Sequence, residues 1–249
     1  DYTSEQLAQL FASDPNAFNR WGAGQTLMTN ILLKNDSKIS ETDLSLLNDA
    51  LSKVIQDEDL DNALKALAIL PPDLASLIGQ SEQIDLDRLF AKHQQFKHHL
   101  AKTLEASWVS IYSTIAGNTA GDRQLRNTAL AYMMLADPKR HLDLAIKQQT
   151  QADNMSDEIA ALQVIAKSPQ GYKTESINQF YRKWQNEELV MDKWFAAQAI
   201  NHEEAVLEHV KFLLNHEKFS IENPNKVRSL IGAFVSGNTP QFHSATGAG

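Results

Sequence analysis

Apolar residues recur at intervals of three or four along much of this chain, which is the period of a helix with one buried side. The longest such stripe runs from residue 86 to residue 115 and predicts one long helix. Strand-like alternation is absent from that stretch. Its stripe positions are Leu89, His93, Phe96, Leu100, Leu104, Trp108, Ile111 and Ile115.

Further helices are indicated where a capping residue precedes proline, because proline fits the first helical position without losing a hydrogen bond. Loops are expected at residues 34–42 and 70–83, where the period is interrupted. The pattern predicts an all-α fold: a superhelical, solenoid-like array of antiparallel helix pairs, with about ten to thirteen helices. The three capping sites are Asp14-Pro15, Asp137-Pro138 and Asn223-Pro224. Two shorter apolar stripes also have the helical period, one formed by Leu125, Ala129, Tyr132, Met133 and Ala136 and the other by Val206, Val210, Leu213 and Leu214.

Composition narrows the classes of protein to consider. With 10 Gly and 7 Pro in 249 residues, no stretch reads as an interdomain linker, so residues 1–249 are expected to form a single helical domain. The net charge of −8 and the lack of a Lys/Arg run argue against nucleic-acid binding. Cysteine is absent, which excludes disulfides and fits a cytoplasmic location. No apolar run is long enough for a membrane span.

Two fragments resemble the opening of the His-Glu-x-x-His zinc motif, in which two histidines one helical turn apart hold one ion. They begin at His202 and at His216, but the fifth position is Val206 in one and Ser220 in the other. Neither fragment is therefore expected to bind metal. His202, His209 and His216 are spaced seven apart and would align on one helix, while His93 is expected to be a core or boundary histidine.

No catalytic set of nucleophile and base is found in the sequence: the chain lacks a Gly-x-Ser-x-Gly motif and any cysteine. Gly22-Ala23-Gly24 lacks the third glycine of a dinucleotide loop and is expected to permit close helix packing near Trp21. Acidic groups such as 57–59 and 187–188 are typical of solvated helix ends. No catalytic residue is predicted in this chain.

Two later segments differ from the rest of the chain, one in its tryptophan content and the other in the cations at its helix start. Residues 181–195 contain two of the four tryptophans, which favours a densely packed helix pair. The segment after Asn223-Pro224 places Lys226 and Arg228 in the first turns of a helix. Cations there oppose the helix dipole, so each is expected to need a carboxylate partner or a ligand.

These two segments closely resemble the C-terminal helical domain of the bacterial aminopeptidase N family, which consists of zinc metallopeptidases also called alanyl aminopeptidases. The resemblance covers nearly the whole chain, although Gly22 and Gly24 stand where relatives tend to carry better helix formers. It is carried by Leu189-Val190-Met191-Asp192-Lys193-Trp194-Phe195, by residues 223–234 with Arg228-Ser229-Leu230-Ile231-Gly232-Ala233-Phe234, by residues 18–27 and by Leu125-Arg126-Asn127.

The resemblance implies a non-catalytic domain that caps the active-site cavity of a longer chain and controls peptide access. It implies that zinc is held in the parent's catalytic domain and not here, and that the partners are the catalytic and other N-terminal domains of the same chain, together with peptide substrates. It also implies that the parent hydrolyses N-terminal amino acids from peptides, that Arg228 faces the substrate cavity, and that the chain lacks the family's last helices.

An alternative is a free-standing helical-repeat scaffold that binds a partner protein on its concave face. A helical enzyme of another kind is less favoured, because no catalytic set converges in the sequence.

Overall fold

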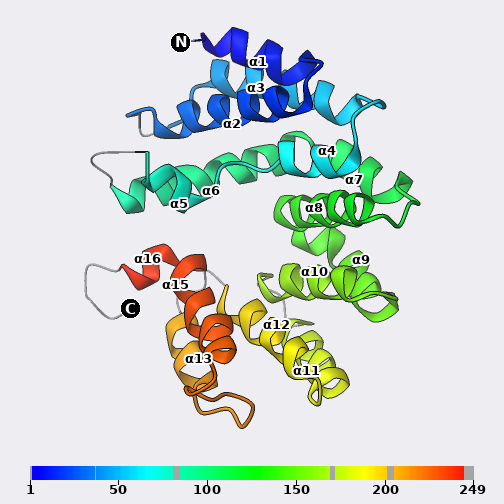
Figure 1. Ribbon diagram of the computed structural model, residues 1–249, viewed down its shortest axis with the longest axis vertical. Coiled ribbons are helices and arrows are strands. Elements are labelled where there is room, and N and C mark those ends of the chain that lie inside the picture. The colour runs from blue at the N-terminus through cyan, green and yellow to red at the C-terminus, as the bar shows by residue number, and fades with distance from the viewer. Residues whose placement is uncertain (1, 37, 81–84, 169–171, 201–204, 244–249) are drawn as a thin grey trace. The chain divides into compact units, whose positions relative to one another are not determined.

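A computed structural model of the chain describes residues 2–36, 38–80, 85–168, 172–200 and 205–243. Within these ranges the chain forms helices and no β-strand, which confirms the predicted all-α class (Figure 1). The residues group into two compact units, Asp1–Asp137 and Pro138–Gly249. None of the described helices is both long and apolar enough to cross a membrane.

The first unit is built around α1, which packs on both α2 and α3, and around α8, which packs on α4, α6 and α7. Its fully buried side chains include Phe11, Leu47, Phe96 and Trp108. The helices are α1 (Ser4–Ser13), α2 (Ala17–Leu33), α3 (Glu41–Gln56), α4 (Asn62–Ala68), α5 (Leu74–Ile78), α6 (Leu86–Thr103), α7 (Glu105–Thr114) and α8 (Ala120–Ala136).

The predicted single helix over residues 86–115 is wrong in one respect, because the chain bends at Leu104 and forms α6 and α7. Leu104 has φ −103° and ψ 19°, outside the helical region. The i→i−4 hydrogen bonds still continue through the bend, from Leu104 N to Leu100 O and from Trp108 N to Leu104 O. The bend also lets the Trp108 indole N–H donate to Leu100 O at 3.1 Å.

The second unit has a separate core, formed mainly by α10 to α13 and the last long helix. That helix is continuous from Pro224 to Gly237 and contains a π-helical segment, η1 (Arg228–Gly232). The elements are α9 (Pro138–Gln151), α10 (Met155–Ala166), α11 (Tyr172–Trp184), α12 (Glu188–Ala199), α13 (Val206–Leu213), α14 (Pro224–Val227), η1, α15 (Ala233–Gly237) and α16 (Thr239–Phe242).

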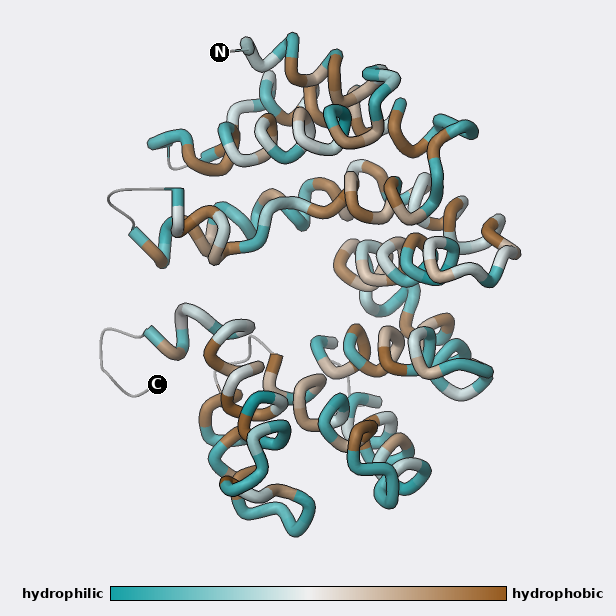
Figure 2. The backbone as a smooth tube through the Cα atoms, in the orientation of Figure 1, coloured by the Kyte–Doolittle hydropathy of each residue, from teal (hydrophilic) through white to brown (hydrophobic). Residues whose placement is uncertain are grey.

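Short connections pair consecutive helices in both units. Residues 14–16 join α1 to α2 and residues 152–154 join α9 to α10, and the members of each pair pack side by side, as antiparallel helix pairs do. In Figure 2 hydrophobic and hydrophilic stretches alternate along the long helices, as one-sided burial requires. The pairing confirms the expected array of helix pairs.

The described helices outnumber the predicted ten to thirteen even when α14, η1 and α15 are counted as one, because the separate helices α5 and α16 have only five and four residues. One of these, α5, lies inside the loop expected at 70–83, where the Asp73 side chain caps it by accepting from Ser76 N. Residues 81–83 of that loop lie outside the described residues.

Two of the three predicted helix starts are confirmed, and for the start at Asn223 the predicted side-chain cap is present as well. Helix α9 begins at Pro138, and the Asn223 side chain caps α14 by accepting from Asn225 N at 2.9 Å. The prediction for Asp14-Pro15 is wrong by two residues. Asn16 is the N-cap of α2. Asp14 is instead the C-cap of α1, and its carboxylate accepts a hydrogen bond from Asn16 N–H.

Candidate functional site

The two segments that carry the family resemblance pack against each other in the second unit. Helix α12 contacts α14, η1 and α15, so the string ending at Phe195 lies against the string ending at Phe234. Leu230 and Phe234 are buried in the same core as Trp194 and Phe195. The Trp194 indole N–H donates to Ile177 O on α11 at 3.1 Å, in keeping with the dense helix pair expected there.

Lys226 is buried, with 3% of its surface exposed, and its charge is fully paired. Its ammonium donates to Asp192 Oδ1 at 2.8 Å and to the Glu188 backbone oxygen at 2.9 Å, and Glu188 Oε2 lies 2.9 Å away. Burial alone would lower the pKa of Lys226, but the two carboxylates outweigh it and raise that pKa. Lys226 therefore joins α12 to the start of the last helix.

Arg228 has the opposite environment. It is exposed and begins the π-helical segment, in which Ala233 N bonds to Arg228 O, five residues back. No described residue is hydrogen-bonded or ion-paired to its guanidinium. Single π-helical turns inside α-helices occur frequently at functional sites. Of the two cations singled out in the sequence, Arg228 is thus the one left available for a ligand.

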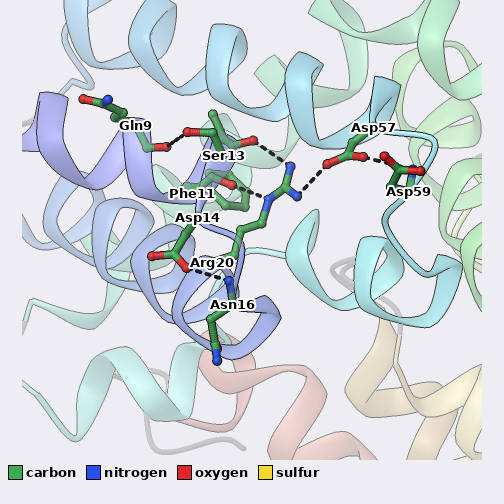
Figure 3. Close-up of polar contacts among 9 residues, drawn as sticks. Gln9, Phe11, Ser13, Asp14, Asn16, Arg20, Asp57 and Asp59 are labelled. Atoms are coloured by element: carbon green, nitrogen blue, oxygen red, sulfur yellow. Dashed lines mark hydrogen bonds and ion pairs between the residues drawn. The ribbon is translucent and has the colours of Figure 1, made fainter.

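Arg20 is a buried arginine that connects its own helix to two others (Figure 3). The sequence indicates no role for it beyond its place in the family-like segment 18–27. With 6% of its surface exposed, it donates to Phe11 O at 2.9 Å and Ala12 O at 2.6 Å at the end of α1. Its third contact is Asp57 Oδ2 at the end of α3, at 2.6 Å. Arg20 fixes three helices of the first unit and is not exposed to a ligand.

Gly22 and Gly24 differ in their surroundings. A Cβ built on Gly24 would lie 2.6 Å from the buried Phe11 ring, whereas nothing lies within 4 Å of one built on Gly22. The expectation that this glycine pair permits close helix packing therefore holds for Gly24, on the α1 side of α2, and is wrong for Gly22.

The histidine row predicted for one helix is not found. Helix α13 ends at Leu213, so His216 lies in the following loop, and His202 lies outside the described residues. His209 Nε2 lies 3.1 Å from Gln198 Oε1. His93 is buried with Nε2 3.0 Å from Pro72 O, which confirms it as a core histidine.

The acidic groups named in the sequence have structural roles. Asp57 pairs with Arg20, and the first-turn Glu188 pairs with Lys226. Among the described residues no three His, Asp or Glu side chains come together as a metal site requires. The described part of the chain thus offers Arg228, and no group of metal ligands, as its candidate functional feature.

Comparison with known families and proteins gives consistent matches. The family model described as "Domain of unknown function (DUF3458_C) ARM repeats" matches residues 4–249. Aminopeptidase N of Haemophilus influenzae is 33% identical over 260 residues, which covers 100% of this chain and 30% of that protein. Aminopeptidase N of Escherichia coli K12 is 31% identical over 259 residues, with the same coverages. The chain thus spans about 30% of the length of these relatives.

A solved structure has the same fold. The crystal structure of Legionella pneumophila aminopeptidase A in complex with aspartic acid matches with a TM-score of 0.85 and 25% sequence identity. The match covers 99% of this chain and 31% of that one. A description in terms of ARM repeats agrees with the solenoid-like array of helix pairs expected from the sequence.

Proposed function

Because the chain belongs to the DUF3458_C family of ARM-repeat domains, we propose that it is the non-catalytic C-terminal domain of a larger zinc aminopeptidase. The observation that carries this proposal is coverage: the whole chain aligns with aminopeptidase N, yet it accounts for only 30% of that protein. In this proposal residues 1–249 act as one domain, made of the two compact units. Its partners are the other domains of the same chain.

The proposed role is to cap the cavity in which the parent enzyme removes N-terminal amino acids from peptides. A helical cap would admit short or unfolded peptides and keep bulk water from the reacting centre. The dense packing of α12 on the last helix supports this role, because a wall must hold its shape while substrate passes.

Zinc is assigned to the parent's catalytic domain. The described part of this chain brings together no set of three ligating side chains, so its residues do not fit a zinc site and no catalytic step is assigned to them. The absence of cysteine supports a cytoplasmic location for the parent.

Arg228 is the residue proposed to face the substrate cavity and help to orient peptides. Its guanidinium is exposed and unpaired among the described residues, and it can hold a carboxylate or carbonyl oxygen through several N–H donors. Lys226 cannot take this role, because its ammonium is buried and already bound to Asp192 and Glu188.

The test uses the full-length parent with Arg228→Ala, and Arg182→Ala as the control, since Arg182 is an exposed arginine in a surface pair with Glu175. Loss of a charge-assisted hydrogen bond predicts a rise in KM for peptides of about tenfold or more, with unchanged zinc content. The control should keep its KM. Equal KM and kcat values of the Arg228→Ala variant and the unsubstituted enzyme across peptide lengths would contradict the proposed role of Arg228.

The non-catalytic nature of the domain is tested separately with the chain alone. Purified residues 1–249, incubated with zinc and an alanyl chromogenic substrate, should give no turnover. Zinc-dependent hydrolysis by the isolated chain would contradict the proposal of a non-catalytic domain.

A further inference from the structure

The loop that joins α13 to α14, residues 214–223, is attached to the second unit through His216. The His216 imidazole lies among three aromatic rings, with centroid distances of 5.3 Å to Tyr181, 5.1 Å to Trp194 and 5.7 Å to Phe195. Tyr181 is on α11 and the other two are on α12. A single side chain thus ties the loop to two helices.

His216 also organises the loop backbone. Its Nδ1 accepts the Lys218 backbone N–H at 3.1 Å, and the His216 carbonyl accepts Phe219 N–H at 2.8 Å. An Nδ1 that accepts a hydrogen bond carries no proton, so this geometry corresponds to a neutral ring with its proton on Nε2. Phe219 then packs on Phe195, with ring centroids 6.0 Å apart.

The charges around the ring come from the loop and from α11 and α12. Burial lowers the pKa of His216, the Glu217 carboxylate raises it, and the Lys218 ammonium lowers it, with a lowered pKa as the net result. On α11 the Tyr181 hydroxyl donates to Glu217 Oε1 at 2.9 Å. On α12 the ring neighbours are uncharged, and Glu188 is the carboxylate that acts on Lys218.

We propose that His216 is an acid-sensitive anchor, whose protonation on Nδ1 releases the 214–223 loop from α11 and α12. The added proton would point at the Lys218 N–H, so two donors would face each other and the hydrogen bond would be lost. The charged form of the ring is also disfavoured because the ring is half-buried. The loop leads directly into the Asn223 cap and the helix that bears Arg228.

The direction of the effect follows from the lowered pKa. A histidine that is harder to protonate in the folded state stabilises that state above its unfolded pKa of about 6.5. This stabilisation is lost as the pH falls below about 6.5 and through the lower folded pKa. The attached loop is therefore expected at neutral pH and the released loop under mild acid.

The experiment combines two measurements on the chain. Nitrogen-15 NMR of the histidines at pH 7.5 should show His216 as the neutral tautomer with its proton on Nε2. Hydrogen exchange of residues 214–223, followed by mass spectrometry and corrected for the intrinsic rate, should quicken about threefold or more between pH 7.5 and pH 5.0.

Matched variants separate the anchor from general acid effects. His216→Asn keeps a side-chain acceptor for Lys218 N–H but does not titrate, and His216→Phe keeps a ring but has no acceptor. In both variants the acceleration of exchange between pH 7.5 and pH 5.0, the pH step, should be lost. His209→Gln is the control and should keep it. A pH step that persists in both His216 variants, no step in the unmodified chain, or a proton on Nδ1 at pH 7.5 would each overturn the proposal.

Discussion

At the scale of single residues, the position of a charge along a helix decides less than the partners it meets. Lys226 and Arg228 stand two residues apart in the first turns of one helix, where the dipole disfavours both. Lys226 is stabilised by Asp192 and Glu188 from α12. Arg228 meets no described partner and stays exposed. The sequence predicted the unfavourable position of both cations but not which one was paired.

Arg20 gives a prediction about stability. Arg20→Ala leaves the Phe11 and Ala12 carbonyls without their donor and removes a buried side chain, so the free energy of unfolding of the first unit should fall by about 2–4 kcal/mol. Urea denaturation measures this. Arg88→Ala is the control, because Arg88 is exposed where it bonds Asn35, and it should cost less than about 1 kcal/mol. Equal losses in the two variants would contradict the anchoring role of Arg20.

At the scale of helices, the bend at Leu104 shows what periodicity misses. The apolar stripe passes unbroken from Leu100 through Leu104 to Trp108, and the hydrogen bonds continue through the bend. A stripe reports which side of a helix is buried, but it does not report a change in the direction of the axis. The bend depends instead on one backbone conformation and on the packing of α6 and α7 on α8.

Replacing each glycine of the α2 pair by alanine is expected to change the stability of the first unit in opposite directions. Gly22→Ala should stabilise the first unit by about 0.5–1 kcal/mol, because alanine favours helix and the site is open. Gly24→Ala should be destabilising, because a methyl group 2.6 Å from the fully buried Phe11 ring costs about 1–3 kcal/mol and outweighs that gain. Thermal unfolding of the two variants side by side checks both signs. Stabilisation by Gly24→Ala would mean that α1 can move away freely.

At the scale of the whole molecule, the described residues form two hydrophobic cores, one in each compact unit. One is formed in the first unit around Leu47 and Phe96, and the other in the second unit around Met191 and Phe195. The sequence has no linker composition at the boundary, where Asp137-Pro138 begins α9. Composition therefore gives no sign of this division, which depends on which helices share a core.

Two cores predict two responses to local damage. Leu47→Ala and Met191→Ala each remove a fully buried side chain and should cost about 2–5 kcal/mol. Hydrogen exchange followed by mass spectrometry should show the loss of protection mainly within the unit that carries the substitution. An equal loss of protection in both units for either variant would indicate that the 249 residues unfold as one cooperative body.

The sequence by itself determined the helical class, the paired array, the start of α9 at Pro138, the cap at Asn223, and the segments that resemble a known family. These features depend on residues a few positions apart, so the chain carries them locally. Only the tertiary structure decided which charges are paired, because Arg20 meets Asp57 37 positions away and Lys226 meets Asp192 34 positions away. It likewise decided that His216 leaves the helix of His209 to lie among aromatic rings on α11 and α12, because those contacts join segments far apart in the sequence.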